Sequence, residues 1–122
     1  MGSTTFSGPV TSEDGFVGTI SGAFKGDVQT VTTSTAANIT TLSTVMAPPG
    51  AGNLAITLAD GYAGQLKILT VSSTGGGSAV VTPTTFANGT TLTFNAAADT
   101  CMLLFVATVG WTLVSDRSVT VA

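Results

Sequence analysis

The chain has 122 residues, a formal charge of −3 and only 7% charged residues. This length suits one domain, and average soluble domains have about a quarter of their residues charged. The three basic residues lie far apart at Lys25, Lys67 and Arg117, which argues against a phosphate-binding patch for nucleic acid. The chain has no histidine, so histidine-dependent nucleophiles and the commonest zinc sites are excluded.

The shortage of charge has two interpretations. The first is a soluble β domain whose surface is rich in hydroxyl groups. The second, which we favour, is a surface largely covered by neighbours in an assembly, because interface cores are depleted in charge. A membrane partner is not expected, because the longest apolar run of the C-terminal half, residues 101–107, is far shorter than the roughly 20 residues of a membrane span. The first residues predict no secretory signal.

Residues 1–24 differ from the rest and predict an extended N-terminal arm, followed by a β domain over residues 25–122. Pro9 keeps the preceding residue out of the helical region, and a short strand is predicted over residues 16–20. Phe6, Phe16 and Phe24 are each isolated between polar or small neighbours. Such a segment cannot build its own core, so these rings are expected to insert into the domain or into a partner.

The domain predicts a series of short strands in chain order. Residues 28–32 are rich in β-branched side chains. Residues 39–46 are ambiguous, because Ile39, Leu42 and Met46 fall at helical spacing, but the threonines disfavour helix and favour strand. Residues 48–52 form a loop. Further strands are predicted over residues 54–58, 65–71, 79–83, 90–94, 101–106, 111–115 and 119–121.

Clusters of Gly, Pro, Asn and Asp separate these strands, which is typical of antiparallel sheets. The run 65–71 changes face or is covered on both sides, and 101–106 has two apolar faces, as in a central strand. The last strand is predicted to be an edge that is open to pairing with another chain. No repeat of fixed period is evident. The expected fold is therefore all-β, an antiparallel β-sandwich of jelly-roll-like form with an N-terminal arm.

The residues that could carry chemistry have structural explanations. Of the six carboxylates, Asp27 directly precedes a strand, and the others lie in predicted turns: Glu13, Asp14, Asp60, Asp99 and Asp116. No Asp-x-Asp spacing supports a calcium site. Cys101 lies in the most apolar run and is expected to be a buried small hydrophobe. No catalytic residue, metal or cofactor is predicted, and the glycines at 75–77 indicate a loop without a phosphate-binding helix.

Two aromatic residues leave an alternative open. Tyr62 and Trp111 could stack on the apolar face of a sugar, as in a carbohydrate-binding module. The interpretation that we favour is structural, with Trp111 packed under a hairpin and Tyr62 covering the turn at Asp60 and Gly61.

Two stretches resemble proteins of tailed bacteriophages. Residues 5–10 (TFSGPV), with Ser12 and Gly15-Phe16, resemble the opening of short virion structural proteins. Residues 58–67 (LADGYAGQLK), with 81–84, 89–94, 103–105 and 110–111, resemble a β module of capsid-associated and fibre-like phage chains. The resemblance implies a non-enzymatic virion component that is oligomeric and often trimeric.

One compact domain with one arm suits a capsid decoration, or cement, protein better than a complete fibre. The expected partners are two further copies in a homotrimer and the major capsid protein or another virion protein, on the capsid surface after synthesis in the host cytoplasm. The arm residues expected to contact the capsid are Phe6, Pro9, Val10 and Phe16. The alternatives are a head- or tail-fibre module that contacts the host, and a carbohydrate-binding β module.

Overall fold

The structure is a computed structural model that describes residues 2, 5, 7–8, 19, 21–23 and 25–122. In this part of the chain all regular structure is β-strand, which confirms the all-β prediction. The strands are β1 (Val28–Val31), β2 (Thr35–Ala37), β3 (Ser43–Met46), β4 (Leu54–Leu58), β5 (Leu66–Val71), β6 (Ala79–Pro83), β7 (Leu92–Phe94), β8 (Thr100–Val106), β9 (Gly110–Arg117) and β10 (Thr120–Val121).

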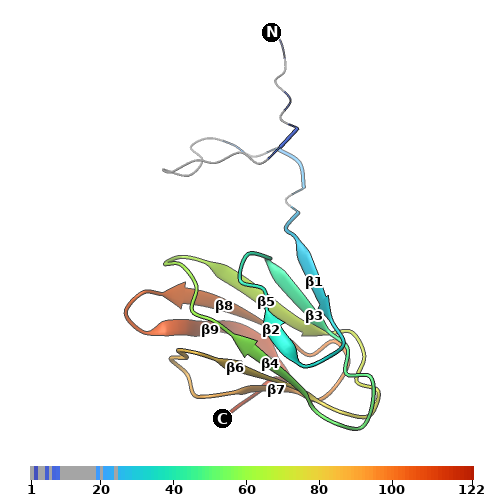
Figure 1. Cartoon of the computed structure of the whole chain (residues 1–122). Coiled ribbons are helices and arrows are strands. Elements are labelled where there is room, and N and C mark those ends of the chain that lie inside the picture. Colours follow the sequence, from blue (N-terminus) through green and yellow to red (C-terminus); the bar gives the residue numbers. More distant parts are fainter. Residues whose placement is uncertain (1, 3–4, 6, 9–18, 20, 24) are drawn as a thin grey trace.

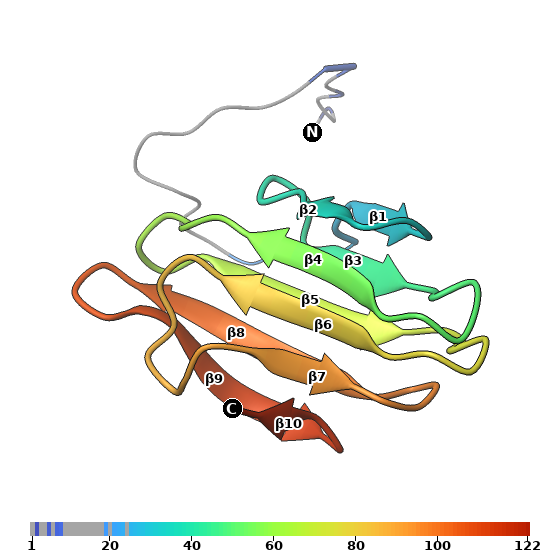
Figure 2. The same ribbon diagram turned by 60° about the horizontal axis from the view of Figure 1, so that its bottom comes forward.

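The strands form two sheets. Sheet A has the order β1-β3-β5-β8-β9, and sheet B has the order β10-β7-β6-β4-β2. The labelled strands of sheet B lie in front of those of sheet A in Figure 2, and Figure 1 shows the same two layers from another side. No helix that could cross a membrane was found among the described residues.

The first six strands alternate between the two sheets. The chain runs from β1 in sheet A to β2 in sheet B and back to β3, so β3 enters sheet A in the same direction as β1. The pairs β2–β4, β3–β5 and β4–β6 are parallel for the same reason. Ser43 pairs with Ile68, and Leu54 with Ala79, so partners in the second and third turns of this coil lie 25 residues apart.

The prediction of antiparallel sheets is therefore wrong for half of the fold. Among the described strands, the pairs β5–β8, β8–β9, β6–β7 and β7–β10 are antiparallel, and both sheets are mixed. Glycine and proline signals show where the chain turns, but they do not show whether the next strand joins the same sheet or crosses to the other one. The first turn of the coil is also shorter, with Val28 paired to Ser43 only 15 residues away, so no fixed period is visible in the sequence.

Strand positions were predicted better than strand partners. The prediction missed β2, which has three residues and no large side chain. Only Ser43–Met46 of the predicted strand 39–46 is strand, because Asn38 Oδ1 accepts hydrogen bonds from the Thr40 amide (2.9 Å) and hydroxyl (2.7 Å) and holds a turn there. The last strand, β10, is an edge as predicted, and its partner β7 belongs to the same chain. The strand predicted over 16–20 falls mostly outside the described residues.

Alternation of side chains builds one core between the sheets. The inward residues of β4 and β8 are buried at every second position, as expected for strands with one covered face. Residues from both sheets form a single buried cluster that includes Met46, Ile56, Leu69 and Phe94. On one side the sheets are also joined by backbone, because Trp111 donates to Thr85 O (3.0 Å) and accepts from the Ala87 amide (2.9 Å).

Candidate interaction surface

The four residues predicted to contact a capsid lie outside the described residues: Phe6, Pro9, Val10 and Phe16. Their part in binding therefore stays a prediction. The described residues of the arm are all exposed: Gly2, Thr5, Ser7, Gly8, Thr19, Ser21, Gly22 and Ala23. A Cβ atom added at Gly2, Gly8 or Gly22 would meet no atom within 4 Å. These described positions therefore do not pack against the β domain.

Trp111 is fully buried, so it cannot offer a ring to a sugar. Its indole Nε1–H donates a hydrogen bond to the Ala59 carbonyl oxygen (2.9 Å), and its ring meets Phe105 edge-on with centroids 5.2 Å apart. The packing interpretation of Trp111 is confirmed. Tyr62 is 70% exposed, whereas the Trp111 ring is buried and cannot lie beside it on the surface. The two-ring sugar platform is therefore not formed.

The groups with chemical potential are scattered or enclosed. No cluster of three metal-ligating His, Cys, Asp or Glu side chains occurs in the described residues. The Asp99 carboxylate accepts hydrogen bonds from the amides of Asn95 (2.8 Å) and Ala96 (2.9 Å), so it caps a turn. Cys101 is buried, as predicted. Burial raises the pKa of its thiol to about 12, with a smaller contribution from the Asp116 carboxylate, while a backbone hydrogen bond involving Leu69 acts in the opposite direction.

Lys67 was missed as a structural residue. It points inward from β5 and is fully buried. Its ammonium group donates to Asn38 O (2.8 Å), Thr41 O (2.9 Å) and Thr41 Oγ1 (3.0 Å). Burial lowers the pKa of Lys67 to about 8. The group holds the turn at residues 38–42 against sheet A and is not available to an outside ligand.

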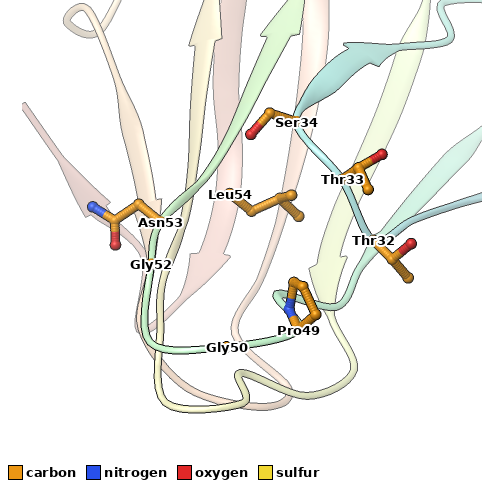
Figure 3. A pocket seen from close by; sticks show the side chains of 8 residues that line it. All are labelled: Thr32, Thr33, Ser34, Pro49, Gly50, Gly52, Asn53 and Leu54. Atoms are coloured by element: carbon orange, nitrogen blue, oxygen red, sulfur yellow. The ribbon is translucent and has the colours of Figure 1, made fainter.

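A notch lies at one end of the β1–β4 region (Figure 3). It has a volume of about 340 Å³ and is lined by Thr32, Thr33, Ser34, Pro49, Gly50, Gly52, Asn53 and Leu54. The link Thr32–Ser34 between β1 and β2 is shorter than the link between β3 and β4, and the notch lies between the two. Its lining consists of hydroxyl, amide and apolar side chains and glycine backbone.

The outer face of sheet A carries large aliphatic side chains. We call it the aliphatic face and define it by Val45, Leu66, Ile68, Met102, Leu104 and Val106, which alternate with the buried core residues of β3, β5 and β8. The register makes these residues neighbours, since Leu66 pairs with Leu104, and Ile68 with Met102. Val28 of β1 lies in the Ile68 row and is 58% exposed, and Leu66 is 45% exposed.

The outer face of sheet B is chemically different. We call it the hydroxyl face and define it by Ala36, Ala55, Thr57, Val80, Thr82 and Thr93, which alternate with the core residues of β2, β4, β6 and β7. Thr57 and Thr82 pair directly across β4 and β6. A sheet face in contact with water is normally polar, and this face fits that rule, whereas the aliphatic face does not.

Charge is confined to the margin of the aliphatic face. Thr30, Val45, Thr70, Thr100 and Arg117 form one row across sheet A, and Arg117 stands at its end, on the edge strand β9. Two threonines of this row, Thr70 and Thr100, have hydrogen-bond partners inside the sheet. Thr70 Oγ1 and Thr100 Oγ1 lie 2.6 Å apart, and Thr100 also donates to Ala98 O (3.0 Å). These hydroxyl groups therefore do not need water as a partner.

Comparison of the chain with protein-family models, curated proteins and solved structures found no match. Sequence reasoning recognised that residues 65–71 and 101–106 are apolar on both sides, which was the available signal for the aliphatic face. It could not assign which side faces the core, because Leu66-Ile68 and Leu69-Val71 are equally apolar.

Proposed function

We propose that this chain is a non-enzymatic structural protein of a tailed-bacteriophage virion, and that it decorates the capsid. In this proposal the N-terminal arm binds the major capsid protein, and the β domain self-associates. The observation that carries the proposal is the exposure of every described arm residue, including Gly2, Gly8 and Gly22, where an added Cβ would meet no neighbour. Such positions remain available to another surface.

Self-association makes a weak arm effective. If several arms of one oligomer bind neighbouring sites of a lattice, each additional contact is intramolecular and total affinity rises without any new type of contact. We propose a trimer for this purpose. We also propose that the two sheets form a sandwich, whose parallel pairs among β1–β6 depart from the all-antiparallel jelly roll that was expected.

The buried positions of Cys101 and Lys67 remove the two most reactive described side chains from solvent, and the described residues hold no metal-ligating cluster. A head- or tail-fibre module differs from a decoration protein in copy number. Mass spectrometry of purified particles is expected to find hundreds of copies for decoration and a dozen to a few dozen for a fibre, as order-of-magnitude expectations for repeated lattice sites.

The arm is tested by binding to capsids that lack this protein. A chain without residues 2–16, and a full chain with Phe6→Ser and Phe16→Ser, are expected to keep the oligomer of the parent chain but to lose at least about tenfold in capsid affinity, a loss of roughly 1.4 kcal/mol. Thr5→Ala is the matched control and is expected to bind normally. Full capsid binding by both arm variants would refute the role of the arm.

A further inference from the structure

We infer that the aliphatic face is the interface between copies of this chain, and that three copies pack these faces around a threefold axis. The inference deepens the proposed function, since it names the surface through which the oligomer forms. It can hold even if the oligomer has no place on a virion, because it depends only on the composition, hydrogen bonding and dimensions of sheet A.

The two outer faces of the domain differ in composition. Both faces are made by the same alternation of inward and outward residues, so folding alone does not explain why one carries threonine and alanine and the other Leu66, Ile68 and Met102. Contiguous apolar patches on a protein surface mark interaction sites. Removing these side chains from water favours association in proportion to the apolar area covered.

The aliphatic face can pack against that of another copy without burying an unpaired charge. Buried unpaired charges strongly oppose association. Across the rows defined by strand pairing, Arg117 is the charged residue of the outer face, and it lies on β9 at the margin. The hydroxyl groups of Thr70 and Thr100 lie 2.6 Å apart, so Thr70 can donate to Thr100 while Thr100 donates to the Ala98 carbonyl oxygen. A second copy therefore needs to supply no specific polar partner for them.

The width of sheet A also suits three copies. Five strands about 4.8 Å apart give a sheet roughly 19 Å wide. Three such sheets arranged as the sides of an equilateral prism each lie about 5.5 Å from the axis, which matches half of the roughly 10 Å between packed sheets. The aliphatic side chains of three copies would fill the space inside. With strands about 20 Å long, the footprint is roughly 400 Å² per copy, or about 1,200 Å² for the whole trimer, shared among its three contacts.

The edges of sheet A favour three copies over a face-to-face pair. The strand β1 is an edge of sheet A, and the structural devices that protect exposed edges, proline, charge and bulges, do not occur in its sequence, Val28-Gln29-Thr30-Val31. Ring closure brings the β1 edge of one copy beside the β9 edge of the next, a heterologous contact that closes on itself and has the exposed Arg117 at its rim. A face-to-face pair would leave both β1 edges open to further pairing.

The test is the mass of the full chain in solution, measured by light scattering and native mass spectrometry. The parent chain is expected to be a trimer, and Ile68→Lys on the aliphatic face is expected to reduce the mass threefold. Thr82→Lys on the hydroxyl face adds the same charge to an exposed strand position and is expected to leave the trimer intact. Circular dichroism checks the fold of each variant. Leu66→Lys serves as a second variant. Leu66 is already 45% exposed, so the ammonium group of a lysine there can reach solvent in the monomer, and the fold is expected to be kept.

Each alternative occupant gives a different result. A parent chain that stays monomeric at high concentration overturns the inference, as does a trimer that Thr82→Lys dissociates while Ile68→Lys and Leu66→Lys do not. A dimer dissociated by Ile68→Lys keeps the interface but overturns the threefold arrangement. A third possibility is that the chain's own arm covers the aliphatic face. The chain is then a monomer, and a thiol introduced by Leu66→Cys in a Cys101→Ala background is protected from alkylation. This result also overturns the inference.

Failure of this inference can be separated from failure of the proposed function. A trimer that Ile68→Lys dissociates, together with absence of the protein from purified phage particles, keeps the interface and refutes the virion role. A monomer found in many copies on particles keeps the virion role and refutes the interface.

Discussion

The ammonium group of Lys67 donates a hydrogen bond of 2.8 Å to the carbonyl oxygen of Asn38, although Lys67 is fully buried. The same group also donates to the carbonyl and hydroxyl oxygens of Thr41. The three donors of an ammonium group are therefore matched by three acceptors from one turn. This turn lies where the chain passes from β2 in sheet B to β3 in sheet A, so Lys67 fixes a crossover between the sheets.

Lys67→Met is expected to destabilise the protein at pH 7. Methionine keeps most of the side-chain volume but leaves the Asn38 and Thr41 acceptors without their donor, and a buried polar group without a partner costs about 1–3 kcal/mol. The expected fall in Tm is roughly 5–15 °C for a domain of this size, measured by calorimetry. Lys25→Met, at an exposed lysine, is the control and should change stability by less than about 0.5 kcal/mol. An unchanged Tm for Lys67→Met would contradict this role.

The pH dependence of stability should carry the signature of Lys67. Burial lowers its pKa in the folded protein to about 8, below the value of 10.5 for a free lysine. Between these values the unfolded chain binds more protons than the folded one, so this group makes folding more favourable as pH rises from about 8 to 10.5. Denaturant unfolding should show the parent chain gaining stability relative to Lys67→Met over this window, by on the order of 1–3 kcal/mol. A difference between the two that stays constant with pH would rule the shift out.

Cys101 should be nearly inert to alkylation in the folded protein. Burial is the main cause that raises its pKa from 9.0 to about 12, and the thiolate is the reactive form. At pH 8 the thiolate fraction is therefore lower by about three orders of magnitude than in the unfolded chain. Iodoacetamide should label Cys101 only in denaturant. A Cys101→Ala chain carrying Thr82→Cys on the hydroxyl face should be labelled rapidly without denaturant, and rapid labelling of native Cys101 would show that β8 opens.

Gly77 should not tolerate a side chain. It is buried where the loop between β5 and β6 packs on the loop between β3 and β4, and a Cβ atom there would lie 2.5 Å from Gly50 O. Gly77→Ala is expected to cost about 1–3 kcal/mol, because overpacking forces the backbone to shift. Gly52→Ala is the matched control on the opposing loop, where a Cβ would meet no atom within 4 Å. Equal stability of the two variants, measured by urea unfolding, would show that the loops can separate freely.

The sequence predicted strand positions well because the apolar runs and their glycine and proline breaks are local signals. It failed on pairing, because the direction in which β3 enters sheet A depends on the passage of β2 through sheet B. It also failed on Lys67, since a lysine between Leu66 and Ile68 suggests an outward side chain. The register of β5 with β8 instead turns Lys67 toward the core and both aliphatic neighbours outward. The predicted arm contacts are a separate matter, because Phe6 and Phe16 lie outside the described residues.

The passage of the chain back and forth from β1 to β6 has a consequence for how the molecule forms and breaks. Neither layer is a continuous piece of chain, so neither can assemble first and wait for the other. A nick in any of the connections between β2 and β6 divides both layers at once. Melting should accordingly be all-or-none, and because parallel partners are distant along the chain, folding should be slow for a protein of this length.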